Sequence, residues 1–369
     1  MTPNSFGFAD IDWNFRATTA NSPTEGLHPY PAKFIPAIPG TLLDRLPLVP
    51  GSAVLDPFCG SGTTLVECQR RGIISVGVDL NPIACLMTRV KTNTVPAGIH
   101  EAIFATMARA RAVKSPPIPE IPNLDHWFRK DIQEALASLS VTIRAASETH
   151  QDILRLALSS IIVRVSNQDS DTRYAAVPKK GTHHDVFLSF ERAAYNIVQS
   201  LCQRGYNLTS ATVIEADTLR LKPQDIRPRP SVVITSPPYP NAYEYWLYHK
   251  YRMWWLGLDP LAVKEKEIGA RAHFFSTNPH TANHFVGQMR QTFALLKNVM
   301  IPGGYACFVI GRSKIHGAII DNAQIIVDAS ALFGFAPVFR TERTILAHRK
   351  SFNLSHANIK TETVLIFRN

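Results

Sequence analysis

The chain has 369 residues, of which 45% are hydrophobic and 18% are charged, and this composition excludes an intrinsically disordered chain. Its length suits one large α/β domain with an insertion, or two modest domains. The formal charge of +10 would draw it toward a polyanion, although many basic proteins bind no nucleic acid. We find no signal sequence and no apolar run long enough for a bilayer, and therefore expect a cytoplasmic protein without membrane contact.

The cysteines exclude two further classes of protein. All five are scattered, and none has Cys-x-x-Cys spacing: Cys59, Cys68, Cys85, Cys202 and Cys307. Such a set argues against a disulfide framework and against a zinc site, and it suits a reducing cytosol. The histidines show no metal-ligand spacing either, so we expect no bound metal.

The predicted elements begin after a polar, irregular N-terminal extension, residues 1–27, which we expect to pack loosely. Apolar spacing from Phe34 to Leu46 then predicts a short helix. A strand, a glycine-rich turn, a helix and a second strand follow at residues 52–55, 56–63, 64–72 and 73–78. Elements in this order are typical of the opening of a doubly wound parallel sheet.

The middle of the chain has a different pattern. Four prolines within residues 111–125 indicate a linker or a stiff crossing segment. Periodic Leu, Ile and Val over 153–165 and 187–201 predict helices, and the polar stretch 167–181 between them has no period. We therefore expect residues 97–205 to be a largely helical insertion between strands of the sheet.

The sheet resumes in the last part of the chain. Strands are predicted at residues 211–216, 231–234, 305–310, 338–346 and 363–367, and helices at 284–300 and 322–332. The last two strands are expected to pair antiparallel. The whole pattern predicts an α/β fold with a doubly wound, mostly parallel seven-stranded sheet, whose two halves are residues 28–96 and 206–369.

The first motif that carries chemistry is Asp56-Pro-Phe-Cys-Gly-Ser-Gly-Thr63. Gly60 and Gly62 allow a sharp turn and a close approach to a ligand, and the next helix presents free N–H groups. Asp79 ends the following strand, where a carboxylate can accept both ribose hydroxyls of a nucleoside. The missing third glycine argues against a pyrophosphate site and favours a cofactor without phosphate, with Phe58 as a wall for an adenine or a sulfonium. Glycine turns of this kind also occur at purely structural corners.

The second motif, Thr235-Ser-Pro-Pro-Tyr239, ends the apolar run 231–234. The prolines lock a loop at the carboxyl edge of the sheet, where open α/β sheets bind ligands. A rigid loop can aim the Ser236 hydroxyl and the Pro237 carbonyl at an amino group, and Tyr239 can stack on the base that carries it. A lone Pro-Pro-Tyr is more often a mere turn, so its place after a strand is what favours this interpretation.

Together, Asp56–Thr63 and Ser236–Tyr239 resemble the amino-methyltransferases of bacterial restriction–modification systems. In that family Ser-Pro-Pro-Tyr is typical of enzymes that act on cytosine N4, and Asp-Pro-Pro-Tyr of enzymes that act on adenine N6. His28-Pro-Tyr-Pro-Ala-Lys-Phe34 is similar to the segment that borders the methionine end of the cofactor. The resemblance covers about residues 28–95 and 205–369 and implies S-adenosylmethionine as the cofactor.

The resemblance also implies roles for single residues. Residues 28–96 would be the cofactor-binding half and residues 206–369 the catalytic half of a methyltransferase domain. Cofactor contacts are implied for Lys33, Phe34, Asp56, Phe58, Gly60, Gly62, Thr63, Asp79 and Asp217. Catalytic roles are implied for Ser236, Pro237, Pro238 and Tyr239.

Basic side chains are candidates for contacts with DNA phosphates. They form two clusters, Arg173, Lys179, Lys180 and Arg343, Arg349, Lys350. A solvated charged face explains each cluster equally well. The family's target-recognition region usually lies near the Pro-Pro-Tyr motif, whereas the insertion at 97–205 comes earlier, so the short segment 259–283 is the alternative recognition element.

We therefore predict direct in-line transfer of a methyl group to cytosine N4 in double-stranded DNA, without a covalent enzyme intermediate. The amine is stacked and paired in a duplex, so the target base would be flipped into the pocket. A restriction endonuclease acting at the same site is a candidate partner. Two alternatives stay open. The first is a different substrate, either adenine N6 in DNA or a base amine in RNA. The second is a different class of protein, a methyltransferase-like nucleic-acid-binding protein without turnover.

Overall fold

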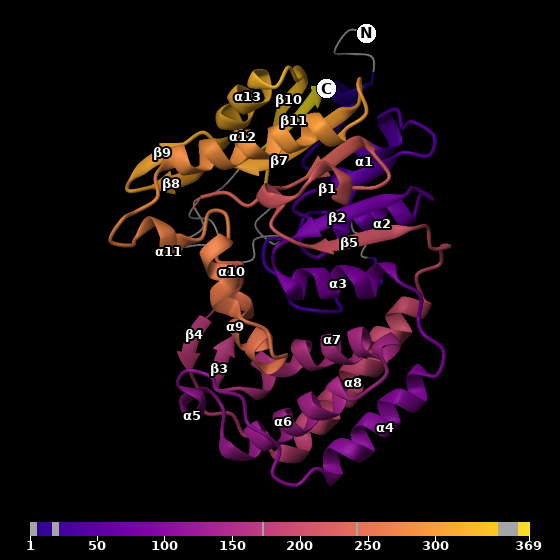
Figure 1. The fold of residues 1–369 in the computed structure, drawn as a ribbon, viewed down its shortest axis with the longest axis vertical. Coiled ribbons are helices and arrows are strands. Elements are labelled where there is room, and N and C mark those ends of the chain that lie inside the picture. Colours follow the sequence, from indigo (N-terminus) through magenta and orange to yellow (C-terminus); the bar gives the residue numbers. More distant parts are fainter. Residues whose placement is uncertain (1–5, 17–21, 172, 241–242, 346–360) are drawn as a thin grey trace.

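The computed structural model describes residues 6–16, 22–171, 173–240, 243–345 and 361–369, and these are built around a seven-stranded sheet (Figure 1). The strands lie in the order β10-β11-β7-β6-β1-β2-β5. Their bounds are β1 Ala53–Asp56, β2 Ser75–Asp79, β5 Ala211–Glu215, β6 Pro230–Thr235, β7 Tyr305–Gly311, β10 Ala336–Thr344 and β11 Thr361–Arg368. Strand β11 runs antiparallel to both of its neighbours, β7 and β10, and the other described strand pairs of this sheet are parallel. The predicted doubly wound, mostly parallel α/β sheet and its final antiparallel pair are confirmed.

The strand order reverses between β1 and β6. After β1 the chain steps outward to β2 and then β5, and after β6 it steps outward on the other side to β7. Every residue of β1, β6 and β7 is buried, as expected for continuous apolar strands covered on both faces. In such sheets a crevice opens at the reversal, beyond the carboxyl ends of the two central strands.

Five helices lie next to the sheet: α1 Ala37–Arg45, α2 Thr63–Gln69, α3 Pro82–Thr92, α12 Ala282–Val299 and α13 Asn322–Leu332. Four of them correspond to predicted helices, and α3 was missed. Its start is marked locally, because the Asn81 side chain accepts a hydrogen bond from the backbone N–H of Ile83, 2.9 Å away, and Pro82 occupies the first helical position.

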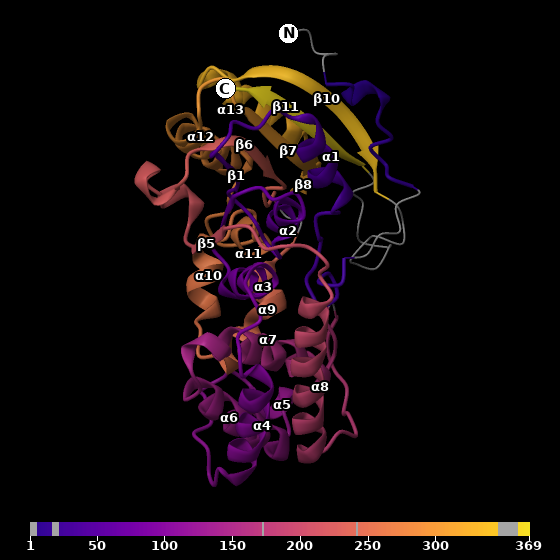
Figure 2. The same ribbon diagram turned by 90° about the vertical axis from the view of Figure 1, so that its right-hand side faces the viewer.

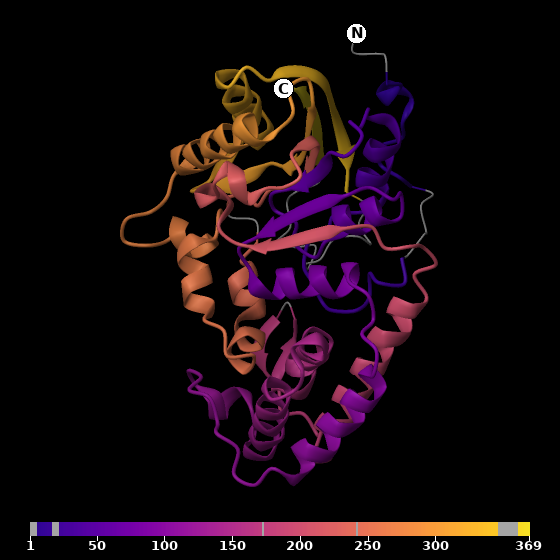
Figure 3. The same cartoon turned by 45° about the vertical axis from the view of Figure 1, so that its right-hand side comes forward.

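A helical layer lies below α3, away from the sheet (Figures 1 and 3). It contains α4 Ile99–Ala112, α5 Leu124–Trp127, α6 Lys130–Arg144, α7 Glu148–Val165 and α8 His183–Cys202. The stretches predicted as helical, 153–165 and 187–201, lie within α7 and α8. The polar stretch 167–181 contains a hairpin, β3 Gln168–Ser170 and β4 Arg173–Ala176, that the sequence pattern did not reveal.

Helices α9 and α10 join the helical layer to the sheet (Figure 2). The remaining elements are α9 Tyr245–Trp255, α10 Pro260–Lys266, α11 Arg271–Phe274, the hairpin strands β8 Ser313–Ile315 and β9 Ala318–Ile320, and short 3-10 turns at Phe8–Asp10, Thr218–Arg220 and Pro223–Asp225. Within the described ranges, no helix is long and apolar enough to cross a membrane.

The expectation that residues 1–27 pack loosely was wrong for two aromatic side chains. Phe8 and Trp13 are 1% and 4% exposed. The indole Nε1 of Trp13 donates to the carbonyl of Phe8, 3.1 Å away. Both rings pack in the same apolar cluster as Val309 and Ile366 of the sheet, so the aromatic side chains of a mostly polar segment cover part of one sheet face.

Candidate active site

The glycine-rich turn lies between β1 and α2, and two of its residues have backbone angles that disfavour side chains. Gly60 and Gly62 have φ values of 49° and 83°. A Cβ on Gly62 would lie 2.7 Å from side-chain atoms of Thr88, and one on Gly60 would lie 3.0 Å from the Tyr30 hydroxyl. Both positions therefore require glycine, because a side chain would be strained and would displace a neighbour.

Helix α3 holds this turn from behind. The Thr88 hydroxyl donates to the Gly60 carbonyl at 3.0 Å, and the Lys91 ammonium donates to the Ser61 carbonyl at 2.7 Å. Burial lowers the pKa of Lys91 to about 7. The turn is thus fixed by polar bonds on the side that faces α3, and its other side borders a cavity.

Asp79, at the end of β2, closes the turn from the neighbouring strand. Its Oδ2 accepts from the Gly60 backbone N–H and its Oδ1 from the Asn81 backbone N–H, both at 2.8 Å. Burial raises the pKa of Asp79 to about 6, against the opposing effect of these bonds. The Gly60 N–H is therefore already bonded to a carboxylate of the protein, an arrangement that leaves it unavailable to a phosphate.

Asp56 joins the two central strands at the reversal point. Its Oδ1 accepts from the Thr235 hydroxyl of β6 at 2.7 Å and from the Phe58 N–H at 3.2 Å. Burial raises the pKa of Asp56 to about 6. Because β1 and β6 run parallel, this bond lies beside the point where β6 ends and Ser236 begins the Pro-Pro-Tyr loop.

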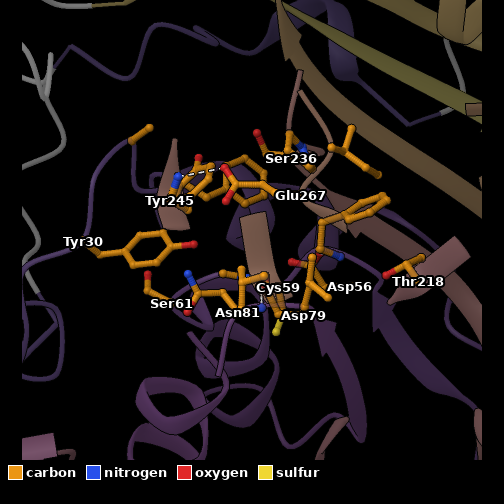
Figure 4. A pocket seen from close by; sticks show the side chains of 18 of the residues that line it. Tyr30, Asp56, Cys59, Ser61, Asp79, Asn81, Thr218, Ser236, Tyr245 and Glu267 are labelled. Carbon is orange, nitrogen blue, oxygen red and sulfur yellow. Dashed lines mark hydrogen bonds between the residues drawn. The ribbon is translucent and has the colours of Figure 1, made fainter. Parts of the chain in front are cut away.

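The Pro-Pro-Tyr loop is backed closely by another segment. A Cβ on Gly269 would lie 2.6 Å from the Tyr239 carbonyl oxygen, and Gly269 has a φ of 75°. Pro237 is buried, whereas Ser236 and Pro238 are partly exposed and line the cavity. The loop is therefore held from behind by the chain that follows α10, with its serine toward the cavity (Figure 4).

A single cavity collects most of the residues predicted for the site. Those that line it are Phe34, Asp56, Phe58, Gly60, Thr63, Asp79, Asp217, Ser236 and Pro238. Asp217 follows β5, and its carboxylate accepts the Leu219 N–H at 3.0 Å. The carboxyl ends of β1, β2, β5 and β6 thus converge on this cavity, which lies at the edge predicted from the strand order.

Four predicted residues do not line the cavity. Gly62 is packed against Thr88 of α3, and Pro237 is buried within its loop. The Lys33 ammonium donates to the carbonyls of Glu25 and His28, at 2.7 and 3.4 Å. Tyr239 is partly buried against the apolar cluster of α12 and the sheet, and burial raises its pKa.

The cavity wall also includes residues that were not predicted, among them Tyr30, Tyr245 and Glu267. The rings of Tyr30 and Tyr245 stack with centroids 5.4 Å apart, on the side of the cavity opposite Thr218 (Figure 4). Tyr30 lies in the segment His28–Phe34, whose resemblance to the cofactor-bordering segment of the family pointed to this part of the chain. Tyr245 lies in a run of aromatic residues at helical spacing, a pattern typical of core, and Glu267 belongs to no motif.

Glu267 follows α10 directly, and its buried carboxyl group reaches the N-terminus of α9. Its two oxygens accept from the backbone N–H groups of Tyr245 and Trp246, at 2.8 and 2.7 Å. Burial raises the pKa of Glu267 to about 8, although both of these bonds oppose the rise. This side chain therefore satisfies two free donors at the helix N-terminus and adds an ionisable group to the cavity wall.

The basic clusters have mixed surroundings. Arg173 and Lys180 are exposed, with Arg173 3.6 Å from Asp169, while the Lys179 ammonium donates to the carbonyls of Val163 and Arg164. Arg349 and Lys350 lie outside the described residues.

Arg343 was wrongly grouped with the phosphate contacts. It is 4% exposed, donates to the Trp13 carbonyl at 3.0 Å and pairs with Glu362. Its position in β10, next to β11, directs it inward rather than toward solvent.

Comparison with known proteins agrees with the motifs. Residues 7–89 match the family model described as DNA methylase, N6_N4_Mtase. The type II methyltransferase M.MjaII of Methanocaldococcus jannaschii is 50% identical over 66 residues, which are 18% of this chain and 12% of that protein. M.MvaI of Kocuria varians, also a type II methyltransferase, is 26% identical over 256 residues, 62% of this chain and 56% of that protein. The resemblance to DNA amino-methyltransferases is thereby confirmed, and cytosine N4 is not separated from adenine N6.

The matches cover only part of each relative. The chain spans 12% and 56% of the lengths of the two relatives, so the activities of those whole proteins are proposals for this one. The solved structure of the rRNA methyltransferase aviRa of Streptomyces viridochromogenes aligns with 95% of this chain and 90% of its own, at 14% identity and a TM-score of 0.34.

Proposed function

We propose that this chain, which carries a DNA methylase segment at residues 7–89, transfers a methyl group from S-adenosylmethionine to cytosine N4 in DNA. The observation that carries the proposal is the single cavity that contains both the acids around the glycine turn and Ser236 of the Pro-Pro-Tyr loop. A cofactor and a base held there would meet at the carboxyl edge of the sheet. Transfer between two bound molecules requires such a shared site.

The residues on the cofactor side of the cavity fit S-adenosylmethionine. This molecule has a ribose, an adenine and a sulfonium but no phosphate, and the Gly60 N–H is already bonded to Asp79. Each Asp79 oxygen has a second lone pair that can accept a ribose hydroxyl. Asp217 lies on the same cavity wall as a partner for the adenine, and Phe58 offers an aromatic face to a cation. When bound, S-adenosylmethionine supplies an electrophilic methyl group.

The residues on the base side of the cavity suit an exocyclic amine. The Ser236 hydroxyl, which lines the cavity, would accept a hydrogen bond from the amine and so orient the nitrogen lone pair. The Pro237 carbonyl, which does not line the cavity, would turn toward it to accept from the second hydrogen. Tyr239 would move from its packed position to stack on the base. The amine itself is the nucleophile, so no covalent bond to the protein is needed. A serine before Pro-Pro-Tyr favours cytosine N4 over adenine N6 by resemblance to the family.

The DNA partner follows from the same site. A cytosine amine is paired within a duplex, so the base would be flipped out to reach Ser236. The net charge of +10 supports attraction to the phosphate backbone. The proposal includes a role as the modification arm of a restriction–modification system, with an endonuclease that recognises the same sequence.

Identification of the methylated nucleoside tests the proposal. The full chain would be incubated with methyl-labelled S-adenosylmethionine and unmethylated phage DNA, and the DNA digested to nucleosides for mass spectrometry. We expect label in 4-methylcytosine, and much less with the Ser236→Ala variant at equal times. Label in 6-methyladenine would show that the target is adenine N6, and label in RNA added in parallel would show that the substrate is RNA. No transfer to any nucleic acid, with cofactor still bound, would favour a binding protein without turnover.

A further inference from the structure

A β-hairpin begins at the sheet edge from which the Pro-Pro-Tyr loop also starts. Strands β6 and β7 pair parallel, with Thr235 next to Phe308, so their carboxyl ends lie at the same edge of the sheet. The end of β6 leads into Ser236, and the end of β7 at Gly311 leads into the β8–β9 hairpin. In Figure 1 this hairpin lies next to α11, on the side of the molecule where α10 descends from the sheet.

The β8–β9 hairpin has one buried face and one exposed face. Its two turn residues, His316 and Gly317, have φ values of 46° and 87°, the signs of a tight two-residue turn. Ser313 and Ile315 are buried, whereas Ile319 is 73% exposed. Lys314 is directly opposite Ile319 in the pairing and is also exposed. The outer face therefore presents a large apolar side chain beside a cation.

The loop after α11 places an aromatic ring against this hairpin. Phe275 is 59% exposed, and its ring centroid lies 5.7 Å from that of His316. The Arg271 guanidinium carbon lies 5.1 Å from the centre of the Phe275 ring. Phe275 and Ile319 thus come from two segments that touch, and each has a basic side chain next to it.

The segment that carries Phe275 is bonded to the candidate active site. The two residues before Gly269 line the cavity, and Gly269 itself lies against the Tyr239 carbonyl oxygen. Just before α9 begins, the Glu244 carboxylate accepts the Ala272 N–H at 3.0 Å. The segment that carries Phe275 is therefore the continuation of the segment that forms part of the cavity wall.

We propose that Phe275 and Ile319 form an apolar wedge that inserts into the base stack of duplex DNA beside the target base, with Arg271 directed at the flanking phosphates. The wedge rests on the proposed function, because it describes how the DNA substrate of the methyl transfer would be held. Large apolar side chains inserted between base steps unstack and kink a duplex, which lowers the cost of extruding a neighbouring base. The faces of the DNA bases are an apolar surface on which the wedge can stack, and a cation beside the wedge can pair with the DNA phosphates.

The first test compares duplex with single-stranded DNA. The Phe275→Ala/Ile319→Ala variant would be assayed for methyl transfer to unmethylated phage DNA, native and heat-denatured, at DNA concentrations below saturation. Loss of stacking on a base typically costs about tenfold or more in affinity, so the duplex rate should fall by about that factor. The rate on denatured DNA should change by less than about threefold, because its bases are already unstacked. Equal losses on both substrates, or no loss on the duplex, would overturn the proposal.

A matched control removes the same kinds of side chain elsewhere. Phe104 in α4 and Leu332 in α13 are 72% and 62% exposed. The Phe104→Ala/Leu332→Ala variant deletes the same number of carbon atoms from the surface as the wedge variant does. It should retain the wild-type rates on both forms of DNA, and a similar duplex loss in this control would contradict a local role for the wedge.

A second readout does not depend on methyl transfer. In the Phe275→Trp variant, stacking of the new indole on bases should quench its fluorescence when duplex DNA is added, whereas Phe104→Trp should respond no more than wild type. If the wild-type chain methylates no DNA but Phe275→Trp is quenched, the proposed function fails and the wedge stands. If methylation is observed but neither tryptophan responds, the wedge fails and the proposed function stands.

Discussion

Three buried carboxyl groups surround the candidate active site, and each is held by neutral donors, which are backbone N–H groups and, for Asp56, also the Thr235 hydroxyl. Burial raises the pKa of Asp56 and of Asp79 to about 6, and that of Glu267 to about 8. All three raised values mean that the folded protein favours the protonated form more than the unfolded chain does. These three groups therefore contribute most to the stability of the folded protein at acid pH, and their contribution falls as the pH rises.

Glu267 gives the widest pH window. Its pKa of about 8 in the folded protein lies above the ordinary 4.5, so its contribution to stability is complete below pH 4.5 and is lost as the pH rises through 8. One proton gives a slope of at most about 1.4 kcal/mol per pH unit. Glu267→Gln, which cannot ionise, should flatten the fall in the free energy of unfolding across this window. Urea unfolding at several pH values measures it, and parallel curves for the two proteins would contradict the raised pKa.

Asp79 is the residue on which the cofactor assignment depends most. Asp79→Ala should weaken S-adenosylmethionine binding by about ten- to a hundredfold, because a hydrogen bond to a charged group contributes roughly 1.5–3 kcal/mol. DNA binding should change far less. Calorimetry with the cofactor alone measures the first effect, and Asp79→Asn controls for loss of the bonds to the turn. An unchanged affinity in both variants would remove Asp79 from the cofactor site.

At the residue scale, the sequence pattern predicted those cavity-lining residues that lie at or directly after the end of a strand. Asp79 and Ser236 were predicted because parallel strands bring their carboxyl ends to one edge. Glu267 could not be predicted, since it reaches the cavity through the fold of the segment after α10 and is fixed by N–H groups of α9. Tyr245 was missed because an aromatic residue at helical spacing looks like core whether or not it borders a cavity.

At the scale of elements, long periodic segments were predicted well and short polar ones were not. Helix α13 has the predicted bounds, and β10 and β11 pair antiparallel as expected. The β3–β4 hairpin was missed because its strands have three and four residues and are mostly exposed. Its stability comes from tertiary contacts: Asp171 pairs with Arg252 of α9, and the Tyr174 hydroxyl donates to the Leu247 carbonyl. No local pattern reports such contacts.

The Asp171–Arg252 pair provides a test of how this hairpin is held. Arg252 is fully buried and also donates to the carbonyls of Ser159 and Tyr248, at 3.2 and 2.9 Å. Asp171→Ala would leave a buried guanidinium without its counter-charge, and the partial exposure of Asp171 reduces the expected cost to about 1–3 kcal/mol. Asp169→Ala, which removes the exposed pair with Arg173, should cost less than about 1 kcal/mol. Denaturant unfolding compares the two, and equal small losses would contradict a structural role for the buried pair.

At the scale of the whole molecule, net charge was a poor guide to which of the predicted basic side chains are exposed. The positive charge of the chain is plain from its composition, but Arg343 lies in a buried ion pair and the Lys179 ammonium donates to two carbonyl groups. Arg173 and Lys180 are the exposed members of the described part of the two clusters. Composition counts charges, whereas burial decides which of them remain available to a phosphate.

Salt dependence tests whether the helical layer contacts the DNA backbone. Each phosphate contact contributes about one unit to the slope of log affinity against log salt. Arg173→Ala/Lys180→Ala should therefore reduce that slope by about two if both side chains reach phosphates. The slope is measured by fluorescence anisotropy on a labelled duplex over a series of salt concentrations. An unchanged slope would place the backbone contacts on other elements.

The central claim is that one cavity binds the cofactor on one side and presents Ser236 to the target amine on the other. Single-turnover methyl transfer to DNA at saturating S-adenosylmethionine tests it most directly. Loss of one neutral hydrogen bond, roughly 0.5–1.5 kcal/mol, predicts that Ser236→Ala slows transfer by about two- to tenfold. Cofactor affinity, measured separately, should be nearly unchanged. Wild-type transfer by Ser236→Ala would contradict the claim and leave the Pro-Pro-Tyr loop as a turn without a part in the chemistry.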